Sequence, residues 1–154
     1  MKHAVYDPTE PDWHRAFRRQ AIRDGMKRKA EAGGKPGCTP VGYRNRRDQD
    51  GTAYVEVDPV QGPLVREAFE MATEAWSVRR ILKHLTTKGL RSRHDKELTA
   101  MSLYRILTNP FYCGKIRFNE QLLPGIHEIT IEESTFWHVQ RSMSCKRRTH
   151  ERFS

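Results

Sequence analysis

The sequence predicts a mostly helical α+β fold that combines a helix-turn-helix with a small antiparallel β-hairpin or sheet and a long basic helix near the N-terminus. Three observations lead to this prediction. Two neighbouring segments repeat apolar residues at the period of an α-helix, and short alternating runs are bounded by turn residues. Residues 13–32 allow helix throughout while carrying many Lys and Arg side chains. At 154 residues and 18.0 kDa the chain fits one domain with an additional arm.

The N-terminal part divides into three segments by composition. Residues 1–12 hold two prolines and few apolar side chains, which predicts a loose lead-in. Residues 13–32 predict a basic connecting helix whose apolar stripe is thin and drifts around the helix, so this helix needs a packing partner. Residues 33–47 predict a linker, because six of the ten residues from Gly33 to Gly42 are Gly or Pro and sustain neither helix nor central strand.

Residues 48–143 are expected to form the main domain. It begins with the alternating run Thr52–Val57, which predicts a short strand. Asp58 and the proline after it then begin a helix that runs to about Ala75, and Gln61 is placed to complete a capping box.

Two short amphipathic helices follow, and together they predict the helix-turn-helix. The first begins at the N-cap Ser77 and ends at Gly89, which can take the left-handed conformation that stops a helix. The second begins at the N-cap Thr99 and ends before Pro110, because the residue before a proline avoids the helical region. The apolar side chains that face the core are Val78, Ile81, Leu82 and Leu85 in the first helix and Leu103, Ile106 and Leu107 in the second.

The C-terminal part predicts a hairpin and a final helix. The hairpin is expected to consist of a strand at Tyr112–Phe118, a turn at Gln121–Gly125 and a return strand at Ile126–Ile129. Thr130 and Glu133 predict a capping box for a helix that runs to about Met143. Residues 144–154 are polar and basic, so we expect a frayed tail.

Charge is segregated along the chain, whose formal net charge is +9. Residues 13–47 carry eleven Lys or Arg against two Asp or Glu, and residues 77–117 carry ten against two. Residues 48–76, between them, carry one basic and seven acidic side chains. Two basic blocks separated by an acidic block favour a phosphate-binding surface backed by a solvated opposite face.

Several classes of protein and site are disfavoured by composition. No stretch approaches the roughly 18 apolar residues of a membrane span, and the N-terminus lacks the apolar block of a secretory signal. We therefore expect a cytoplasmic protein without a membrane partner.

Cys38, Cys113 and Cys145 are isolated thiols, which argues against a disulfide framework. The histidines are dispersed and no second Cys/His pair supports a zinc site, so neither metal nor cofactor is expected.

Ordered blocks of residues between about Gly25 and Gln140 carry a family resemblance. The blocks are Gly33-Gly34 through Gly42-Tyr43-Arg44, Val55-Glu56-Val57-Asp58-Pro59 with Val65-Arg66-Glu67-Ala68-Phe69, Ser77 to Leu85, Leu107-Thr108-Asn109-Pro110 with Tyr112-Cys113-Gly114-Lys115, and His127-Glu128 followed by Phe136 and Val139-Gln140. In these blocks and their spacing the chain resembles the DNA-binding "recombinase" domain of the large serine recombinases, the family of serine integrases and related transposases.

The resemblance implies roles for several segments. In that family a catalytic domain with a serine nucleophile precedes this domain and a long helix joins the two, so residues 13–32 resemble the end of that helix. Residues 33–42 then resemble a linker along the DNA minor groove, and the helix after Thr99 a reader of the major groove. The catalytic domain and the zinc ribbon that flank this domain in the family are absent from the sequence. We therefore expect no catalytic residues and no enzymatic activity in this chain alone, with a site-specific serine recombinase as the parent.

The candidate DNA-binding residues fall into three groups. Ser102 and Arg105, on the outward side of the helix capped by Thr99, suit contact with base edges, arginine with guanine above all; phosphate contact is the alternative for Arg105. The cations of the interhelical loop, which clamp phosphates or form a solvated cluster, are Arg91, Arg93, His94 and Lys96. The cations of the extended linker, which can enter a narrow minor groove, are Lys35, Arg44, Arg46 and Arg47. Lys115 is a further candidate, whereas Tyr43 is expected to pack its ring into the core.

The expected function is sequence-specific binding of double-stranded DNA as the recombinase-domain part of a serine integrase or transposase. Its partners would be duplex DNA at an attachment or transposon-end site and other recombinase protomers. Two alternatives remain open: a freestanding helix-turn-helix transcriptional regulator, and a protein-interaction module whose basic faces bind an acidic partner. The lack of an internal packing partner for residues 13–32 argues against the regulator, and the salt dependence of DNA binding separates the interaction module from the other two.

Overall fold

Helices and two short antiparallel hairpins make up the chain, of which the computed structural model describes residues 11–151, with side chains as far as residue 144. In chain order the elements are α1 (Asp12–Glu31), β1 (Tyr43–Arg47), β2 (Ala53–Val57), α2 (Gln61–Thr73), α3 (Val78–Thr87), α4 (Ala100–Leu107), the 3-10 helix η1 (Pro110–Cys113), β3 (Lys115–Phe118), β4 (Gln121–Pro124) and α5 (Glu133–Glu151). The mostly helical α+β class expected from the sequence is confirmed.

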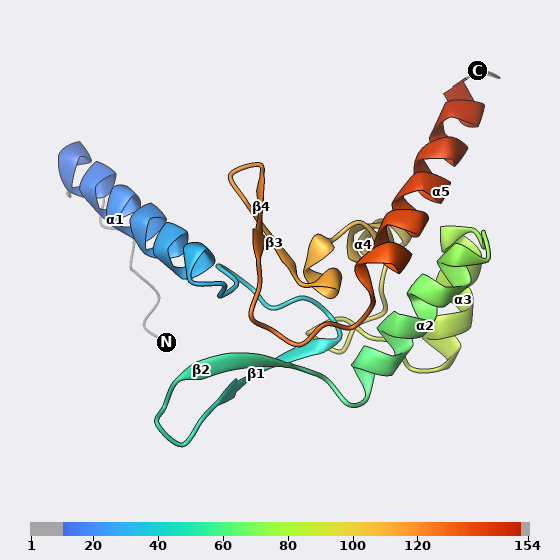
Figure 1. The fold of residues 1–154 in the computed structure, drawn as a ribbon, viewed down its shortest axis with the longest axis horizontal. Helices are drawn as coiled ribbons and strands as arrows, with labels where there is room; N and C mark the ends of the chain where they lie inside the picture. Colours follow the sequence, from blue (N-terminus) through green and yellow to red (C-terminus); the bar gives the residue numbers. More distant parts are fainter. Residues whose placement is uncertain (1–10, 152–154) are drawn as a thin grey trace.

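The helices α2, α3, α4 and α5 gather on one side of the molecule, while α1 extends away on the other side (Figure 1). The β3–β4 hairpin stands between these two parts, and the β1–β2 hairpin projects below them (Figure 1). Helix α1 buries only Ala30, and Trp13 and Phe17 near its start are 68% and 75% exposed. The core is therefore built by the rest of the chain.

One hydrophobic core joins α2, α3, α4, η1, β3 and α5. Its largest fully buried side chains include Tyr112 and Phe111 of η1, Phe69 of α2 and Leu103 of α4. The Phe69 ring lies 5.6 Å from that of Tyr112, between centroids. The 3-10 helix thus supplies the centre of the core with two adjacent aromatic side chains.

The ends of α3 and α4 follow the local signals in the sequence. The Ser77 hydroxyl accepts a hydrogen bond from the Arg80 N–H, and the Thr99 hydroxyl accepts one from the Ser102 N–H. Gly89 has a φ of 95°, and the Leu90 N–H donates to the Leu85 carbonyl, which is the bond of a Schellman stop. The caps predicted for both helices are confirmed.

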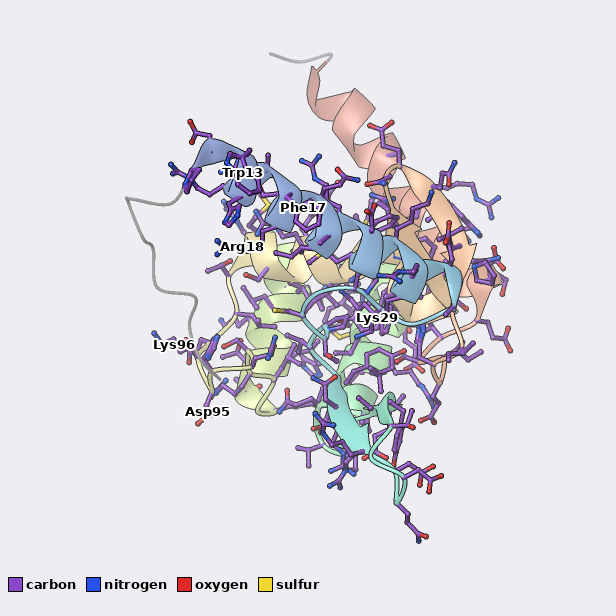
Figure 2. The ribbon with its side chains drawn as sticks, turned by 90° about the vertical axis from the view of Figure 1, so that its left-hand side faces the viewer. Trp13, Phe17, Arg18, Lys29, Asp95 and Lys96 are labelled. Carbon is purple, nitrogen blue, oxygen red and sulfur yellow. The ribbon has the colours of Figure 1, made fainter. Side chains whose placement is uncertain are left out.

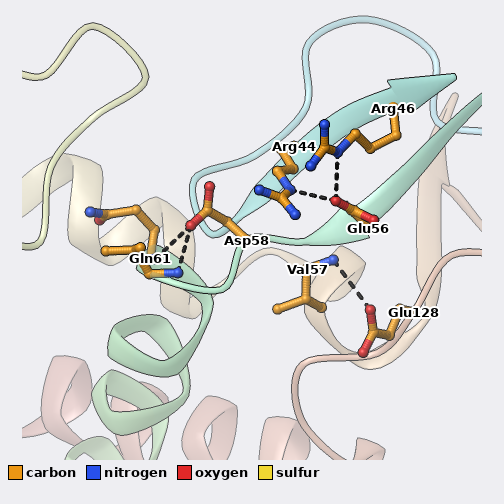
Figure 3. A network of polar contacts seen from close by, with 8 residues as sticks. Arg44, Arg46, Glu56, Val57, Asp58, Gln61 and Glu128 are labelled. Carbon is orange, nitrogen blue, oxygen red and sulfur yellow. Dashed lines mark hydrogen bonds and ion pairs between the residues drawn. The ribbon is translucent and has the colours of Figure 1, made fainter.

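The linker predicted over residues 33–47 ends in a strand, which was not expected. Residues Tyr43–Arg47 form β1, which pairs antiparallel with β2 in a register that sets Arg44 opposite Glu56. After β2, the Asp58 carboxylate accepts hydrogen bonds from the N–H groups of Val60 and Gln61, both at 2.8 Å (Figure 3). Asp58 therefore caps the turn that leads into α2.

Two expected features at the second hairpin are wrong. The predicted strand Tyr112–Phe118 begins with η1, because the Asn109 side chain caps Phe111 and Gly114 closes the turn at a φ of 83°. The return strand β4 begins at Gln121, five residues earlier than expected, since Phe118 pairs directly with Gln121. The two residues of the turn, Asn119 and Glu120, both have positive φ, as a type I′ turn requires.

Two expected capping boxes are also wrong. The Gln61 side chain accepts a hydrogen bond from the Arg91 N–H and donates one to the Gly89 carbonyl, so it binds the loop after α3. Thr130 is 3% exposed and donates its hydroxyl proton to the Tyr43 hydroxyl. In both cases the side chain hydrogen-bonds to a residue distant in the sequence and does not cap the helix end that the local pattern predicted.

The C-terminal helix is longer than expected. Its backbone is helical to Glu151, past the expected end at Met143 and through most of the tail predicted to be frayed. Residues 152–154 of that tail, and residues 1–10 of the predicted lead-in, lie outside the described residues. Within the part of the chain described, no helix is both long and apolar enough to cross a membrane.

Candidate nucleic-acid interface

A groove of about 400 Å³ opens between β1 and the loop that joins α3 to α4. Arg44 lines it from β1, and Arg91 and Arg93 line it from the loop. The fold thus brings cations from both basic blocks of the sequence to one hollow. Its remaining lining consists of Thr39, Val41, Gly42, Tyr43, Asn45, Asp58, Gln61, Ser92 and Asp95.

The loop side of the groove is held by hydrogen bonds to α2 and α3. The Gln61 side chain of α2 hydrogen-bonds to the Gly89 carbonyl and the Arg91 N–H. The Arg91 guanidinium donates to the carbonyls of Thr86 and Leu90. The Thr86 carbonyl lies in the last turn of α3, where a cation is favourable for the helix dipole, and Leu90 follows the helix. Arg91 therefore serves the loop structure, while its half-buried side chain still lines the groove.

The outer part of the loop presents the other cations expected there. Arg93, His94 and Lys96 are exposed. The Ser92 N–H donates to the Lys96 carbonyl at 2.8 Å, which closes a tight turn whose residue Asp95 has a φ of 57°. Figure 2 shows Asp95 and Lys96 at the outer end of this loop, at the margin of the molecule in that view.

Beside the groove, two arginines of β1 pair with one carboxylate of β2, and Arg44 is the member of this cluster that lines the groove. The Nε atoms of Arg44 and Arg46 both donate to Oε1 of Glu56, in the case of Arg46 at 2.8 Å (Figure 3). These hydrogen bonds, from Arg46 first and then Arg44, hold the pKa of Glu56 below its ordinary value. Arg47 is exposed and donates to the Gly51 carbonyl in the hairpin turn.

The outward face of α4 is open to solvent. Met101 is 60% exposed, and the guanidinium of Arg105 is exposed without a hydrogen bond or ion pair to any described residue. The hydroxyls of Thr99 and Ser102 lie 2.9 Å apart, and Thr99 also caps the helix. Arg105 is thus the candidate on α4 whose polar atoms are free for a ligand, while Thr99 is engaged in the helix itself.

Lys35 and Lys115 lie apart from the groove. Lys35 is half-buried, with Nζ 5.7 Å from the centroid of the Phe111 ring, and burial lowers its pKa. It shares a small depression with Arg117, which was not among the predicted DNA-binding residues. The Lys115 ammonium pairs with the Glu133 carboxylate at 3.3 Å. Neither lysine is among the groove-lining residues.

Tyr43 fixes the strand that carries the arginines. Its ring is 6% exposed, as expected, and its hydroxyl donates to the Glu128 carbonyl at 2.9 Å and accepts from Thr130 at 2.8 Å. Burial raises the pKa of Tyr43 to about 12, although the hydrogen bond from Thr130 acts in the opposite direction. The start of β1 is thereby attached to the segment before α5.

Two residues that shape this site were not found from the sequence. Gln61 was assigned to a capping box, and Glu56 was assigned no role beyond the predicted strand. The signal for Glu56 was present: opposite charges that face each other across a hairpin pair readily. The pairing of Glu56 could be predicted only if residues 43–47 were predicted as a strand, and the glycines and prolines before Tyr43 favoured a linker there.

A second hollow of about 360 Å³ has Arg66, Glu70 and Glu132 as its charged lining residues. Among the described residues, no three His, Cys, Asp or Glu side chains are grouped to hold a metal ion. Cys38 is an exposed free thiol and Cys113 a buried one. The side chain of Cys145 lies outside the described residues.

Known proteins share both sequence and fold with this chain. A family model described as Recombinase matches residues 59–146, which is more than half of the chain. A solved structure of a large serine recombinase (LSR)–DNA complex is similar with a TM-score of 0.64 and 25% identity, over 82% of this chain and 38% of that chain. A structure concerned with the sequence requirements of the Listeria innocua prophage attP site is similar with a TM-score of 0.62 and 25% identity, over 79% of this chain and 50% of that one. No curated protein matches the chain.

Proposed function

Since the chain belongs to the Recombinase family, we propose that it binds double-stranded DNA in a sequence-specific manner, as the DNA-binding part of a serine integrase or transposase. The observation that carries this proposal is the groove lined by Arg44, Arg91 and Arg93, in which cations from both basic blocks converge. The similar LSR structure is a complex with DNA, which supports the same ligand for this chain. The family match does not favour a freestanding transcriptional regulator.

Within this proposal the two sides of the groove and α4 have different tasks. Arg93, His94 and Lys96, exposed at the loop tip, bind phosphates and set the orientation of the protein on the duplex. Arg105, exposed on α4, contacts a base edge in the major groove. The extended backbone from Lys35 to Arg47 follows the minor groove, where negative potential is concentrated when the groove is narrow.

The whole protein's activity is a further proposal, because the chain spans 38% and 50% of the two similar chains. We propose that it positions a serine-recombinase catalytic domain for strand exchange at an attachment or transposon-end site. Other protomers of the recombinase would then be its partners, in the cytoplasm where bacterial or phage DNA lies. Sequencing the parent reading frame, and assaying recombination with and without this segment, tests that role.

The DNA-binding proposal is tested by measuring affinity for duplex DNA against salt concentration. If the cations neutralise about 6 to 10 phosphates, affinity falls by about three to five orders of magnitude between 50 and 200 mM salt, because condensed counterions are released on binding. An affinity that does not change with salt would rule out phosphate binding. It would favour the remaining alternative, a module that binds an acidic protein.

A further inference from the structure

Glu56 holds two of the candidate DNA-binding arginines at one point. It lies opposite Arg44 in the β1–β2 register, and Arg46 lies two residues along the same face of β1. One carboxylate oxygen, Oε1, accepts a hydrogen bond from the Nε of each arginine (Figure 3). The side chains of Arg44 and Arg46 are 38% and 51% exposed, so their guanidinium groups remain accessible to a ligand.

This geometry lowers the charge that the hairpin offers to phosphates. The three side chains together carry two positive charges and one negative charge at neutral pH, where a glutamate carboxylate is ionised, and both arginines lower the pKa of Glu56 further. A phosphate that approaches either arginine must compete with a carboxylate already in contact. Binding through counterion release is therefore weaker at this hairpin than two arginines alone would give.

The same geometry orients the guanidinium groups. Both contacts to Glu56 go through Nε, and no hydrogen bond joins Nη1 or Nη2 of either arginine to the described residues. An arginine held in this way has lost part of its side-chain freedom before binding, so a bidentate contact costs less entropy. In the minor groove, where this segment is proposed to lie, the acceptors that such a guanidinium can reach are N3 of adenine and O2 of thymine.

We propose that Glu56 is a positioning residue that sets the sequence specificity of DNA binding, by weakening non-specific phosphate contacts of Arg44 and Arg46 and by fixing the direction of their free Nη groups. This inference rests on the proposed function, since it concerns the same duplex ligand. It assigns to Glu56 a role in the ratio of specific to non-specific affinity, without direct contact between its carboxylate and DNA.

The first experiment measures binding of the wild type and of Glu56→Gln to a short duplex of random sequence over a range of salt concentrations. Removal of the charge lets the arginines bind one or two additional phosphates, so the slope of log affinity against log salt steepens by about 1 to 2. Affinity at the low-salt end rises about threefold or more. Glu56→Asp keeps the charge and is expected to keep the wild-type slope.

The second experiment selects binding sequences from a randomised duplex library with each protein, followed by sequencing. The sequences selected by the wild type are expected to prefer A·T pairs at the positions that the hairpin contacts. The sequences selected by Glu56→Gln are expected to lose that preference at one position or more. This readout depends on orientation of the arginines and is insensitive to a small change in fold stability. Thermal unfolding of each variant identifies any that does not fold. If Glu56→Gln does not fold, the selection compares Glu56→Asp, whose shorter side chain changes the contact to the arginines, with the wild type.

Glu128→Gln is the matched control. The Glu128 carboxylate accepts from the Val57 N–H at 3.3 Å beside the same hairpin, and it pairs with no arginine among the described residues (Figure 3). Its replacement changes the net charge of the protein by the same amount as Glu56→Gln. Equal salt slopes and equal selected sequences for the two variants would overturn the role of Glu56 while leaving DNA binding intact. A wild type that binds no duplex would overturn the proposed function, and this inference with it.

Discussion

Arg105 is the residue at which base reading by α4 is most directly tested. It projects from the open face of the helix without a partner among the described residues, so its guanidinium is available for a bidentate contact with a base. We expect Arg105→Ala to weaken binding to a selected preferred duplex by about 1 to 3 kcal/mol and to leave binding to random duplex nearly unchanged. Competition binding with the two duplexes measures both quantities.

The control for Arg105 is an exposed arginine outside α4. Arg141 of α5 is exposed, and Arg141→Ala removes the same charge from the protein without altering the α4 surface. If Arg105→Ala weakens both duplexes equally, Arg105 contacts phosphate and contributes no base discrimination.

Tyr43 tests how strongly β1 is attached to the body of the protein. In Tyr43→Phe the buried Thr130 hydroxyl loses its acceptor and the Glu128 carbonyl loses its donor. A buried polar group left without a partner costs about 1 to 3 kcal/mol, so we expect a decrease of that size in the free energy of unfolding in urea. Tyr54→Phe is the control, since Tyr54 is 46% exposed and the change should be close to zero.

Tyr43 also makes stability depend on alkaline pH. Its pKa is raised to about 12 in the folded protein, against about 10 in an unfolded chain. Above pH 10 the unfolded chain loses this proton while the folded protein keeps it. The stabilisation is therefore complete below about pH 10 and is lost as the pH rises through about 12, at about 1.4 kcal/mol per pH unit.

Tyr43→Phe lacks this titration. The deficit in its free energy of unfolding relative to the wild type should therefore shrink by about 1.4 kcal/mol between pH 9 and pH 11. Urea unfolding of both proteins at the two pH values measures it. A deficit that stays constant would contradict a raised pKa for this phenol.

Single residues were predictable from the sequence where their partner is close along the chain. The caps Ser77 and Thr99 bond to an N–H three residues ahead, so the pattern alone identifies them. Thr130 and Gln61 show the opposite case. Thr130 bonds to Tyr43, 87 residues away, and Gln61 bonds to Gly89, 28 residues away. Local patterns carry no information about such partners, and both side chains were assigned to capping boxes that do not form.

At the scale of elements, the contact between the β1–β2 hairpin and α2 depends on a glycine. A Cβ added at Gly62 of α2 would lie 2.3 Å from Cγ1 of Val57 at the end of β2. We expect Gly62→Ala to lower the free energy of unfolding by about 1 to 3 kcal/mol. This clash outweighs the roughly 1 kcal/mol that alanine gains over glycine in a helix.

Gly25 of α1 is the matched control for Gly62. It is also helical, and a Cβ added there meets no atom within 4 Å. Gly25→Ala should raise helix content, followed by circular dichroism, and should not lower stability. A decrease in stability in both variants would mean that the close approach of Gly62 to Val57 is not the cause.

The two hairpins show why element boundaries were harder to predict than element types. Strand β1 has the composition of a basic linker, and it becomes a strand only because β2 pairs with it. In the second hairpin the turn falls on Asn119 and Glu120, and glutamate at a positive φ is an uncommon turn residue. Both features follow from pairing between segments, which periodicity within one segment does not record.

At the scale of the whole molecule, the groove could not be located from the sequence, although its cations could be named. Arg44, Arg91 and Arg93 were all candidates, and the fold brings them together because Tyr43 and Gln61 attach their segments to the core. Lys115 was a candidate too, but its pairing with Glu133 sets it apart. Which cations converge is thus decided by long-range contacts.

Helix α1 provides the last test, because it adds charge to the molecule and little to its core. Removing residues 1–28 deletes seven Lys or Arg and four Asp or Glu, and it keeps Ala30, the buried residue of α1. We expect urea unfolding to remain cooperative with a free energy changed by less than about 1 kcal/mol, since side chains as exposed as Trp13 and Phe17 contribute little to the core.

DNA binding by the shortened protein should respond differently from its stability. If α1 lies along the duplex, affinity for random DNA falls and the slope of log affinity against log salt becomes shallower, by about 0.9 for each phosphate that the protein no longer neutralises. Preference among sequences should persist, because Arg105 and the groove arginines are retained. A shortened protein that unfolds without cooperativity would assign α1 a structural role. One that binds DNA with an unchanged salt slope would confine the phosphate-binding residues to the groove and the loop between α3 and α4.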